Sequence, residues 1–372
     1  MIARLYVDNY KCLSNFECRF GHINLMLGAN GSGKSTVFDV LRGVRAVVTG
    51  TSPISLFRES TLTRWQKRDA QTVELEIAGG GGIYQYHLEV EHEIGQNKQR
   101  IQLESVKYDG GLIYRAELGE THLFRDDYSE GPIISGDWTR SSLPFLGPRH
   151  DNTRITWFKD WFRQKLLCLQ IDPVNVKAIA DEAEPVLDAH ALNYVGWYRH
   201  RVSTDMSATI DLYNALKEMY EEFRGLTLEQ EGGSAQHLFA RLGVKEEQKG
   251  RPEFVRYSFG EFSEGERALV ILYTLLQLVG DPETTLCLDE PDNFLSLSEI
   301  QPWLLRLREA VDSSGSQSLL ISHHPELINN LAPRCGLVFE RRQNGPARVR
   351  PFDAGTRDGA LTPSEVVARG WE

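Results

Sequence analysis

Residues 28–36 read Gly28-Ala29-Asn30-Gly31-Ser32-Gly33-Lys34-Ser35-Thr36. This stretch fits the pattern G-x-x-x-x-G-K-[ST], in which a tight loop turns successive backbone N–H groups toward a chain of phosphates. Gly31 and Gly33 permit backbone angles and close approaches that a Cβ atom would block. The Lys34 ammonium can reach the β- and γ-phosphates, and the Ser35 hydroxyl can ligate Mg²⁺. We therefore expect residues 30–36 to line a phosphate-binding site.

The flanking sequence places this loop between a strand and a helix. Ile23-Asn24-Leu25-Met26-Leu27 is a short apolar run, as expected of a buried strand. After the loop, apolar residues recur at helical spacing, at Val37, Phe38, Val40, Leu41 and Val44. The positive end of that helix would point at the phosphates. Strand, glycine loop and helix in this order are the setting that a P-loop nucleotide-binding site requires.

A second apolar strand ends in two carboxylates, in Leu286-Cys287-Leu288-Asp289-Glu290-Pro291. In a P-loop fold, the strand beside the glycine loop delivers such an aspartate to the Mg²⁺ shell, which gives Asp289 the role of a metal ligand. Glu290 would then face the γ-phosphate, where its carboxylate can accept a proton from the attacking water or orient it. The alternative is that both carboxylates only cap a turn before Pro291.

A third feature is the start of a long apolar helix, in Phe262-Ser263-Glu264-Gly265-Glu266-Arg267. Ser263 and Glu266 match the S-x-x-E capping box. The helix continues through a run of aliphatic residues and ends at Gly280 and Pro282. The Ser263 hydroxyl, the Gly265 amide and the helix dipole together predict a second anion-binding point.

These elements resemble the ATP-binding-cassette (ABC) ATPases, whose signature usually reads Leu-Ser-Gly-Gly-Glu/Gln. Here Phe262 replaces the leucine and Glu264 replaces the first glycine. Soluble relatives of the RecF, SMC and overcoming-lysogenization-defect (OLD) group often carry an acidic residue at that position. The opening Asn9-Tyr10-Lys11 also resembles the Asn-Phe-(Arg/Lys) opening of RecF- and SMC-like ATPases.

Two more loops extend the resemblance. Ile321-Ser322-His323-His324 is similar to the switch-histidine loop of this family, which implies that His323 contacts the γ-phosphate and that His324 helps the turn. Asn293 and Ser296 fall where the D-loop of the family crosses a dimer interface. Gln164 and Gln170 both lie near the position of the family's Q-loop glutamine, and the sequence does not decide between them.

The resemblance implies an α/β fold: a P-loop ABC-type ATPase head with a mixed central sheet, an antiparallel β-subdomain and a helical insert lobe. Residues 1–148 would form the first lobe, 149–257 a mostly helical insert, and 258–372 the remaining core with a C-terminal hairpin. Alternating runs at 73–77, 84–90, 101–108 and 112–118 predict the antiparallel sheet. Gly131-Pro132, Pro144 and Gly147-Pro148 predict a linker, and the aromatic stripe in 155–166 predicts a helical core.

The resemblance also implies a mechanism. In this family the P-loop and the signature serine lie on opposite sides of one subunit, so a head-to-tail homodimer with two ATP molecules is expected. Lys34 would neutralise phosphate charge, Ser35 and Asp289 would hold Mg²⁺, and Glu290 would direct water. His323, together with Ser263 and Gly265 from the other subunit, would contact the γ-phosphate.

Composition narrows the function classes. The chain has 372 residues, a net charge of −11 and 5 cysteines in no C-x-x-C pair, which disfavours a disulfide framework or zinc site and suits the reducing cytoplasm. No run approaches the roughly 18 apolar residues of a membrane span, and no signal peptide is evident. The arginines at 341, 342, 348 and 350 indicate a solvated face around an Asn-Gly hairpin rather than a strong nucleic-acid patch.

Two function hypotheses remain. The chain lacks the heptad arms of SMC proteins and has no room after His323 for the nuclease domain of OLD enzymes. The first hypothesis is therefore an ATP-driven regulator of a separate effector protein, such as a nuclease, in defence against phage or in DNA metabolism. The alternative is a RecF-like clamp or repair scaffold that binds DNA directly.

Overall fold

The computed structural model describes residues 1–50, 57–96, 98–244, 254–353 and 361–370, and the chain divides into two compact units. The first unit holds Met1–Cys168, Glu283–Cys287 and Gln317–Glu372, and the second holds Leu169–Pro282 and Leu288–Ser316. The first unit extends past residue 148 because strand β10 (Leu166–Leu169) joins the same sheet as the strand before the glycine loop. The three lobes predicted from the sequence, residues 1–148, 149–257 and 258–372, are divided by the order of the motifs along the chain. They stay a prediction.

The first unit contains an eight-stranded antiparallel sheet, which is the predicted β-subdomain. Its strands follow the order β2-β1-β4-β5-β6-β7-β8-β9. Val73, Leu75 and Ile77 alternate with polar residues, so their side chains share one buried face with cross-strand partners such as Leu5. The strands are β1 (Ile2–Asp8), β2 (Phe16–Arg19), β4 (Ala70–Gly79), β5 (Gly82–Glu93), β6 (Lys98–Tyr108), β7 (Gly111–Glu117), β8 (Glu120–Phe124) and β9 (Glu130–Ser135).

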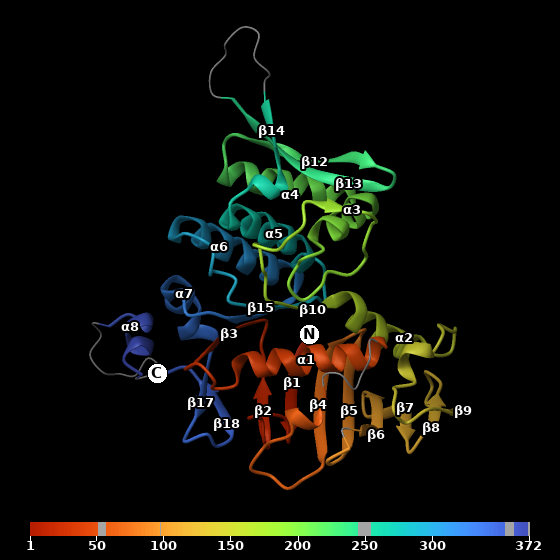
Figure 1. Ribbon diagram of the computed structural model, residues 1–372. Coiled ribbons are helices and arrows are strands. Elements are labelled where there is room, and N and C mark those ends of the chain that lie inside the picture. Colours follow the sequence, from red (N-terminus) through yellow and green to blue (C-terminus); the bar gives the residue numbers. More distant parts are fainter. Residues whose placement is uncertain (51–56, 97, 245–253, 354–360, 371–372) are drawn as a thin grey trace. The chain divides into compact units, whose positions relative to one another are not determined.

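Helix α1 (Lys34–Thr49) lies across this sheet in Figure 1 and joins its core. The apolar positions predicted for the helix, from Val37 to Val44, are buried in the same cluster as the inward residues of β1, β4 and β5. This packing holds the start of α1, which is the end of the glycine loop, on a rigid support.

A six-stranded mixed sheet runs in the order β10-β15-β16-β3-β17-β18. Strand β3 pairs in parallel with β16 and β17, and β17 and β18 form an antiparallel hairpin. The mixed central sheet of the sequence analysis is therefore confirmed. The strands not yet given are β3 (Ile23–Leu27), β15 (Thr285–Asp289), β16 (Gln317–Ile321), β17 (Gly336–Arg341) and β18 (Ala347–Pro351).

The aromatic residues predicted as a helical core lie in α2 (Thr153–Asp160) and in the short π-helix η4 (Trp161–Lys165) that follows it. Phe158, Trp161 and Phe162 are buried, and the Trp157 ring stacks on Tyr84 with centroids 4.7 Å apart. The first unit also contains the short helices η2 (Glu59–Thr61), η3 (Leu143–Phe145), α7 (Pro325–Cys335) and α8 (Pro363–Ala368).

The second unit combines helices with a small sheet. Its helices are α3 (Tyr194–Thr204), α4 (Met206–Met219), α5 (Glu264–Val279), α6 (Leu297–Ser314) and the turn η5 (Phe259–Glu261). Its strands are β11 (Ile179–Ala180), β12 (Phe223–Gly232), β13 (Ala235–Gly243) and β14 (Phe254–Ser258). The range 149–257, which the sequence predicts to be mostly helical, therefore contains β10–β13 and most of β14 as well as α2–α4. The prediction is based on helical spacing in parts of this range, and that spacing gives no information about strands in the other parts.

One local expectation is wrong. Residues 130–135, part of the predicted linker, form strand β9 at the edge of the eight-stranded sheet. An edge strand tolerates Pro132 because one side of its backbone has no ladder to complete. Across the described residues, no helix is long and apolar enough to cross a membrane.

Candidate functional site

The glycine loop joins β3 to α1 in the first unit, as the sequence predicts. Gly28 has a φ of +132°, and a Cβ atom there would lie 2.2 Å from the carbonyl oxygen of Phe339 in β17. Gly33 is the residue before α1, with a φ of +111°, and its Cβ would lie 3.1 Å from the Cys12 sulfur. Both positions require glycine, because side chains rarely adopt these angles and neighbouring atoms fill the space.

The Lys34 side chain folds back over this loop. Its ammonium donates hydrogen bonds to the carbonyl oxygens of Gly28, at 2.6 Å, and Ala29, at 3.2 Å. The residue is only 6% exposed, so a full positive charge is held close to the loop backbone. A positive charge that is held in a buried position favours an anionic ligand.

Ser32 gives the test of whether a phosphate group fits here. Its hydroxyl is buried and has no hydrogen-bond partner within the described part of the chain. Gly31, Asn30 and Ser35 are exposed at the loop, and a Cβ on Gly31 would meet nothing within 4 Å. An orphaned hydroxyl, a buried ammonium and open space beside the glycines together suit a chain of phosphates.

The C-terminal end of β16 lies beside the same loop. Strands β16 and β3 are parallel, with Ile321 opposite Met26, so Ser322 and His323 follow at the edge where Gly28 begins. His323 is exposed, whereas the His324 Nδ1 atom accepts a hydrogen bond from the Glu326 N–H at the start of α7. The structure therefore leaves the His323 ring accessible and gives His324 a capping role.

The two predicted carboxylates lie at the end of β15. Asp289 is buried, and Glu290 has a φ of +49°, an unusual angle for a residue with a side chain. The Asn293 side chain donates a 2.8 Å hydrogen bond to Glu290 Oε2. Sequence reasoning missed both the strained backbone at Glu290 and its contact with Asn293. Burial raises the pKa of the Cys287 thiol in the same strand, which keeps it a neutral core residue.

The predicted capping box forms at the start of α5 in the second unit. The Ser263 hydroxyl donates to Glu266 Oε2 at 2.7 Å, and the Glu266 N–H donates back to Ser263 Oγ at 3.3 Å. Ser263 is exposed. A Cβ on Gly265 would lie 2.7 Å from the Phe294 carbonyl oxygen, so the first turn of α5 packs against the turn that follows Glu290.

The two candidate glutamines occupy different settings. Gln164 lies within η4, and Gln170 is the first residue after β10, which neighbours β15 in the six-stranded sheet. The place of β10 beside β15 in the strand order, which the local sequence does not reveal, distinguishes the surroundings of the two glutamines. Which of them is the Q-loop residue stays open.

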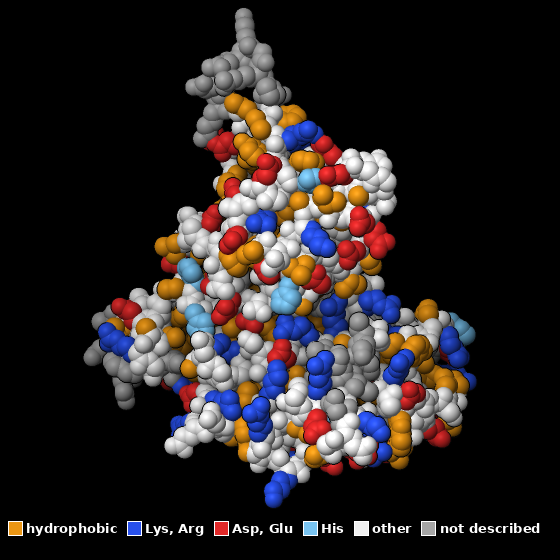
Figure 2. Space-filling model, in the orientation of Figure 1, with side chains coloured by type: hydrophobic (Ala, Val, Ile, Leu, Met, Phe, Trp, Pro, Cys, Tyr) orange, Lys and Arg blue, Asp and Glu red, His pale blue; other side chains and the backbone are white. Residues whose placement is uncertain are grey.

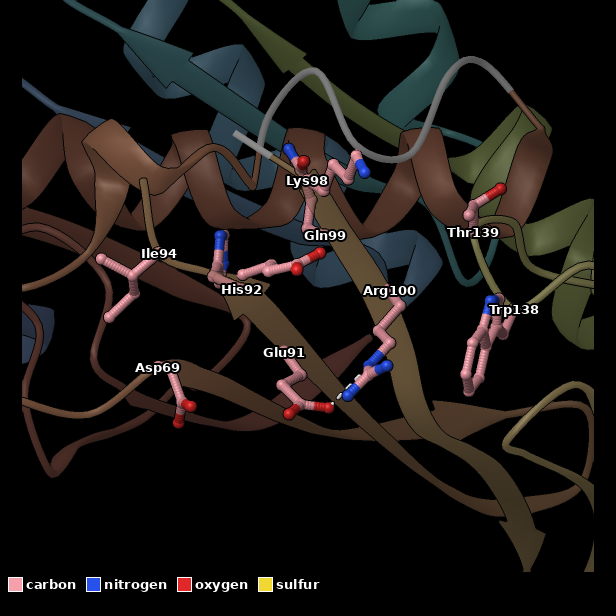
Figure 3. Close-up of a pocket in the computed structure, with 10 residues that line it drawn as sticks. Asp69, Glu91, His92, Ile94, Lys98, Gln99, Arg100, Trp138 and Thr139 are labelled. Carbon is pink, nitrogen blue, oxygen red and sulfur yellow. Dashed lines mark hydrogen bonds and ion pairs between the residues drawn. The ribbon is translucent and has the colours of Figure 1, made fainter. Parts of the chain in front are cut away.

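A separate cavity of about 480 Å³ lies at the ends of β5 and β6 in the first unit (Figure 3). Figure 3 shows Arg100 directed at Glu91, with which it forms a 2.8 Å ion pair, and the Arg100 guanidinium also covers the Trp138 ring at 4.8 Å. Burial lowers the pKa of His92, whose Nε2 atom bonds Gln71 Oε1. The glycine loop is the stronger candidate site, because it combines a buried ammonium with a buried hydroxyl that lacks a partner among the described residues, whereas in this cavity Arg100 is already paired with Glu91.

Comparison with known proteins identifies the family. The family described as "AAA domain, putative AbiEii toxin, Type IV TA system" matches residues 23–329, from β3 to α7. The chain belongs to this family. No curated protein sequence matches the chain.

Solved structures agree on the fold of this AAA-domain protein. An Smc head bound to the C-winged helix domain of ScpA is similar, with a TM-score of 0.57, 13% identity, and 95% of this chain and 98% of that chain covered. An Smc head from Pyrococcus furiosus, bound to the C-terminal domain of ScpA, is similar with a TM-score of 0.56 and 12% identity, and the match covers 95% of this chain and 96% of that chain. An Smc head from Pyrococcus yayanosii is similar with a TM-score of 0.55 and 11% identity, and the match covers 100% of this chain and 99% of that chain.

These findings confirm the predicted group and fold class. At such low identity the solved structures establish the fold alone, which is that of an SMC-type ATPase head. The family assignment places the glycine loop within an AAA domain that covers residues 23–329.

Proposed function

We propose that this chain is a Mg²⁺-dependent ATPase that works as a head-to-tail homodimer and regulates a separate effector protein. The observation that carries the proposal is the build of the loop between β3 and α1. A buried ammonium and a buried hydroxyl without a partner among the described residues lie there, beside Gly28 and Gly33, whose positions leave no room for a Cβ atom. This arrangement supports binding of the triphosphate of a nucleotide.

On binding, the Lys34 ammonium would exchange the carbonyl oxygens of Gly28 and Ala29 for phosphate oxygens. The Ser35 hydroxyl and the Asp289 carboxylate would hold Mg²⁺, which when bound neutralises part of the phosphate charge. Lys34 needs little rearrangement, since its nitrogen already lies within 3.2 Å of both loop carbonyls. Such preorganisation favours tight binding.

Hydrolysis would depend on Glu290. Its carboxylate would orient the attacking water or accept its proton, while Asn293 holds Oε2 in place at 2.8 Å. The backbone conformation of Glu290, with its positive φ, raises the free energy of the folded state by about 1–3 kcal/mol, and the contacts around it hold it in place. Strain of this kind often occurs where a backbone must aim a functional side chain.

The dimer would complete each site. Ser263 and the Gly265 amide of the partner subunit would contact the γ-phosphate together with His323 of the first subunit. The exposed, capped start of α5 supports this role, because its hydroxyl is fixed by Glu266 yet accessible to a ligand. Hydrolysis removes the phosphate that both subunits hold, so the dimer loosens and the effector is released or activated.

Turnover measurements test the enzymatic part. Wild-type protein should release phosphate from Mg-ATP, Lys34→Ala should lose nucleotide binding, and Glu290→Gln should bind ATP but fail to hydrolyse it. Hydrolysis by Glu290→Gln at the wild-type rate would contradict the assignment of Glu290. Purification of the tagged chain together with the products of its neighbouring genes tests the effector, which should co-elute in an ATP-dependent manner.

The Smc complexes offer a precedent for a separate partner, since those heads are bound to domains of another protein, ScpA. That this chain also has a separate partner, an effector protein in defence against phage or in DNA metabolism, is part of the proposal.

A second candidate function, direct DNA binding as a RecF-like clamp, is favoured by one surface of the first unit. Trp65 is 44% exposed, and the Arg341 guanidinium lies 5.6 Å above its ring. Arg64 and Lys67 are exposed beside it, and Figure 2 shows further Lys and Arg side chains over the face that carries α1. Exposed cations next to an aromatic ring suit a polynucleotide.

Two other cations of this unit, Lys11 and Arg42, share a single carboxylate, Asp39, which neutralises part of their charge. The DNA hypothesis predicts an affinity that falls steeply with salt concentration and falls further in Trp65→Ala. Salt-independent or undetectable binding of duplex DNA by the ATP-bound protein would exclude it.

A further inference from the structure

Three side chains in the small sheet of the second unit form a continuous hydrogen-bonded chain. The His237 Nε2 atom lies 2.7 Å from Ser258 Oγ, and its Nδ1 atom lies 2.5 Å from Glu231 Oε2. The three residues come from three strands, with Glu231 on β12, His237 on β13 and Ser258 at the end of β14. None of them takes part in the proposed nucleotide site.

The Glu231 carboxylate fixes the direction of this hydrogen-bonded chain. An ionised carboxylate only accepts, so His237 Nδ1 carries a proton and, in the neutral imidazole, Nε2 accepts the hydroxyl proton of Ser258. Ser258 is also the N-cap of η5: its Oγ atom accepts a 3.2 Å hydrogen bond from the Gly260 N–H, and its own N–H donates to Glu261 Oε2 at 2.6 Å. Serine, base and carboxylate are thus arranged as in hydrolases that use a serine nucleophile.

The sheet holds the histidine in this orientation. His237 stacks on the Phe239 ring with centroids 4.3 Å apart, and the Arg256 guanidinium covers Phe239 at 5.4 Å. Arg256 is itself paired with Glu229, which lies opposite His237 on β12. The charged groups around this site therefore include Glu231, which is bonded to the imidazole, the Arg256–Glu229 ion pair, and Glu261, which accepts a hydrogen bond from the Ser258 N–H.

The serine is also accessible. Ser258 is half-buried, Gly260 is exposed, and the side chain of His237 is 18% exposed. One edge of β13 pairs with β14 from Phe239 to Gly243 and with β11 at Gln236 and His237. Ser258 therefore lies where β14 ends, next to the start of β11, and strand ends are common places for reactive side chains.

We propose that Ser258, activated by His237 and Glu231, is a second reactive centre of this protein and that it hydrolyses unhindered carboxylic esters. Ser258 Oγ forms a bond to the ester carbonyl carbon while its proton passes to His237 Nε2. The bond from that carbon to the alcohol oxygen breaks, and the alcohol leaves with the proton from His237. Water then attacks the acyl-serine, His237 again relays the proton, and the free acid and Ser258 are released.

A fluorophosphonate probe tests this directly, because its phosphorus forms a bond to an activated serine oxygen and fluoride leaves. Wild-type protein should be labelled at one site, and peptide mapping should place the label on Ser258. Ser258→Ala should not be labelled. Ser234→Ala, which changes an exposed serine of the same sheet at the turn before β13, is the matched control and should be labelled like wild type.

Variants of the base separate an activated serine from a merely exposed one. His237→Gln should slow labelling on the order of 10²-fold or more, the usual contribution of a general base. Glu231→Gln keeps a hydrogen-bond acceptor beside Nδ1 and should slow it less. Thermal melting of each variant shows whether the sheet is intact, and hydrolysis of p-nitrophenyl acetate should fall in parallel with labelling.

Three results would overturn the proposal: no labelling of wild type under conditions that label a serine hydrolase, a label on another residue, or equal labelling rates for wild type and a folded His237→Gln. ATP turnover should be unchanged in Ser258→Ala, because the two sites are chemically independent. Failure at this serine therefore leaves the proposed ATPase untouched.

Discussion

Gly28→Ala and Gly31→Ala form a matched pair that tests the structure of the glycine loop. At Gly28 the added methyl group would lie 2.2 Å from the Phe339 carbonyl oxygen, and the φ is +132°. The clashing atom is backbone of β17, which pairs with β3, so no side-chain rotation relieves the contact. Strain of about 1–3 kcal/mol from the backbone angle adds to about 1–3 kcal/mol from overpacking.

Gly28→Ala should therefore lose roughly 2–6 kcal/mol of unfolding free energy, or about 4–24 °C of melting temperature at about 2–4 °C per kcal/mol. Gly31→Ala has the same positive sign of φ, at +76°, but its methyl group would meet nothing within 4 Å. It should cost only about 1–2 kcal/mol. Its main effect should be weaker nucleotide binding, since the methyl group enters the space that the phosphates need.

Differential scanning calorimetry measures the first effect, and titration with a fluorescent ATP analogue measures the second. Equal melting temperatures for the two variants would refute the close contact between the loop and β17. Unchanged nucleotide affinity in Gly31→Ala would refute the placement of phosphates above the loop.

Other substitutions test single contacts. Asn293→Ala should lower kcat for ATP about tenfold with little change in KM, because the Glu290 carboxylate loses a donor worth roughly 1–2 kcal/mol; an unchanged kcat in steady-state assays would exclude the positioning role. His324→Ala should destabilise the protein by about 1 kcal/mol through loss of the α7 cap and keep its ATPase, whereas His323→Ala should lose ATPase and keep stability; the reverse pattern would exchange their roles. Burial raises the pKa of Glu104, which accepts hydrogen bonds from Tyr86, Tyr114 and Ser141, so its contribution to stability is full below pH 4.5 and is lost as the pH rises through the folded-state pKa. Urea unfolding should show that the advantage of wild type over Glu104→Gln shrinks across this window, and a pH-independent difference would contradict it.

The parts of the fold that the sequence predicts are those determined by nearby residues. The glycine loop with its strand and helix follows from a contiguous pattern, and the cap on α5 requires only Ser263 and Glu266. The strands β4 to β7 follow from alternation, because one face of their sheet is buried against α1.

The parts that it does not predict depend on distant residues. Gly131 and Pro132 are typical of a linker, yet they lie in β9 because an edge strand has a free side. The positive φ of Glu290 has no local signature, and neither does the position of Gln170 after β10, which depends on which strand pairs with β15. The chain from Glu231 through His237 to Ser258 arises only when three strands meet.

The central claim is that nucleotide joins two copies of the chain through Ser263. Sedimentation velocity of Glu290→Gln with saturating Mg-ATP tests it most directly. The account predicts a species of twice the 42.2 kDa chain mass, which reverts to the single-chain mass when ADP replaces ATP or when Ser263→Arg is added. A species that remains at 42.2 kDa with ATP bound would contradict it.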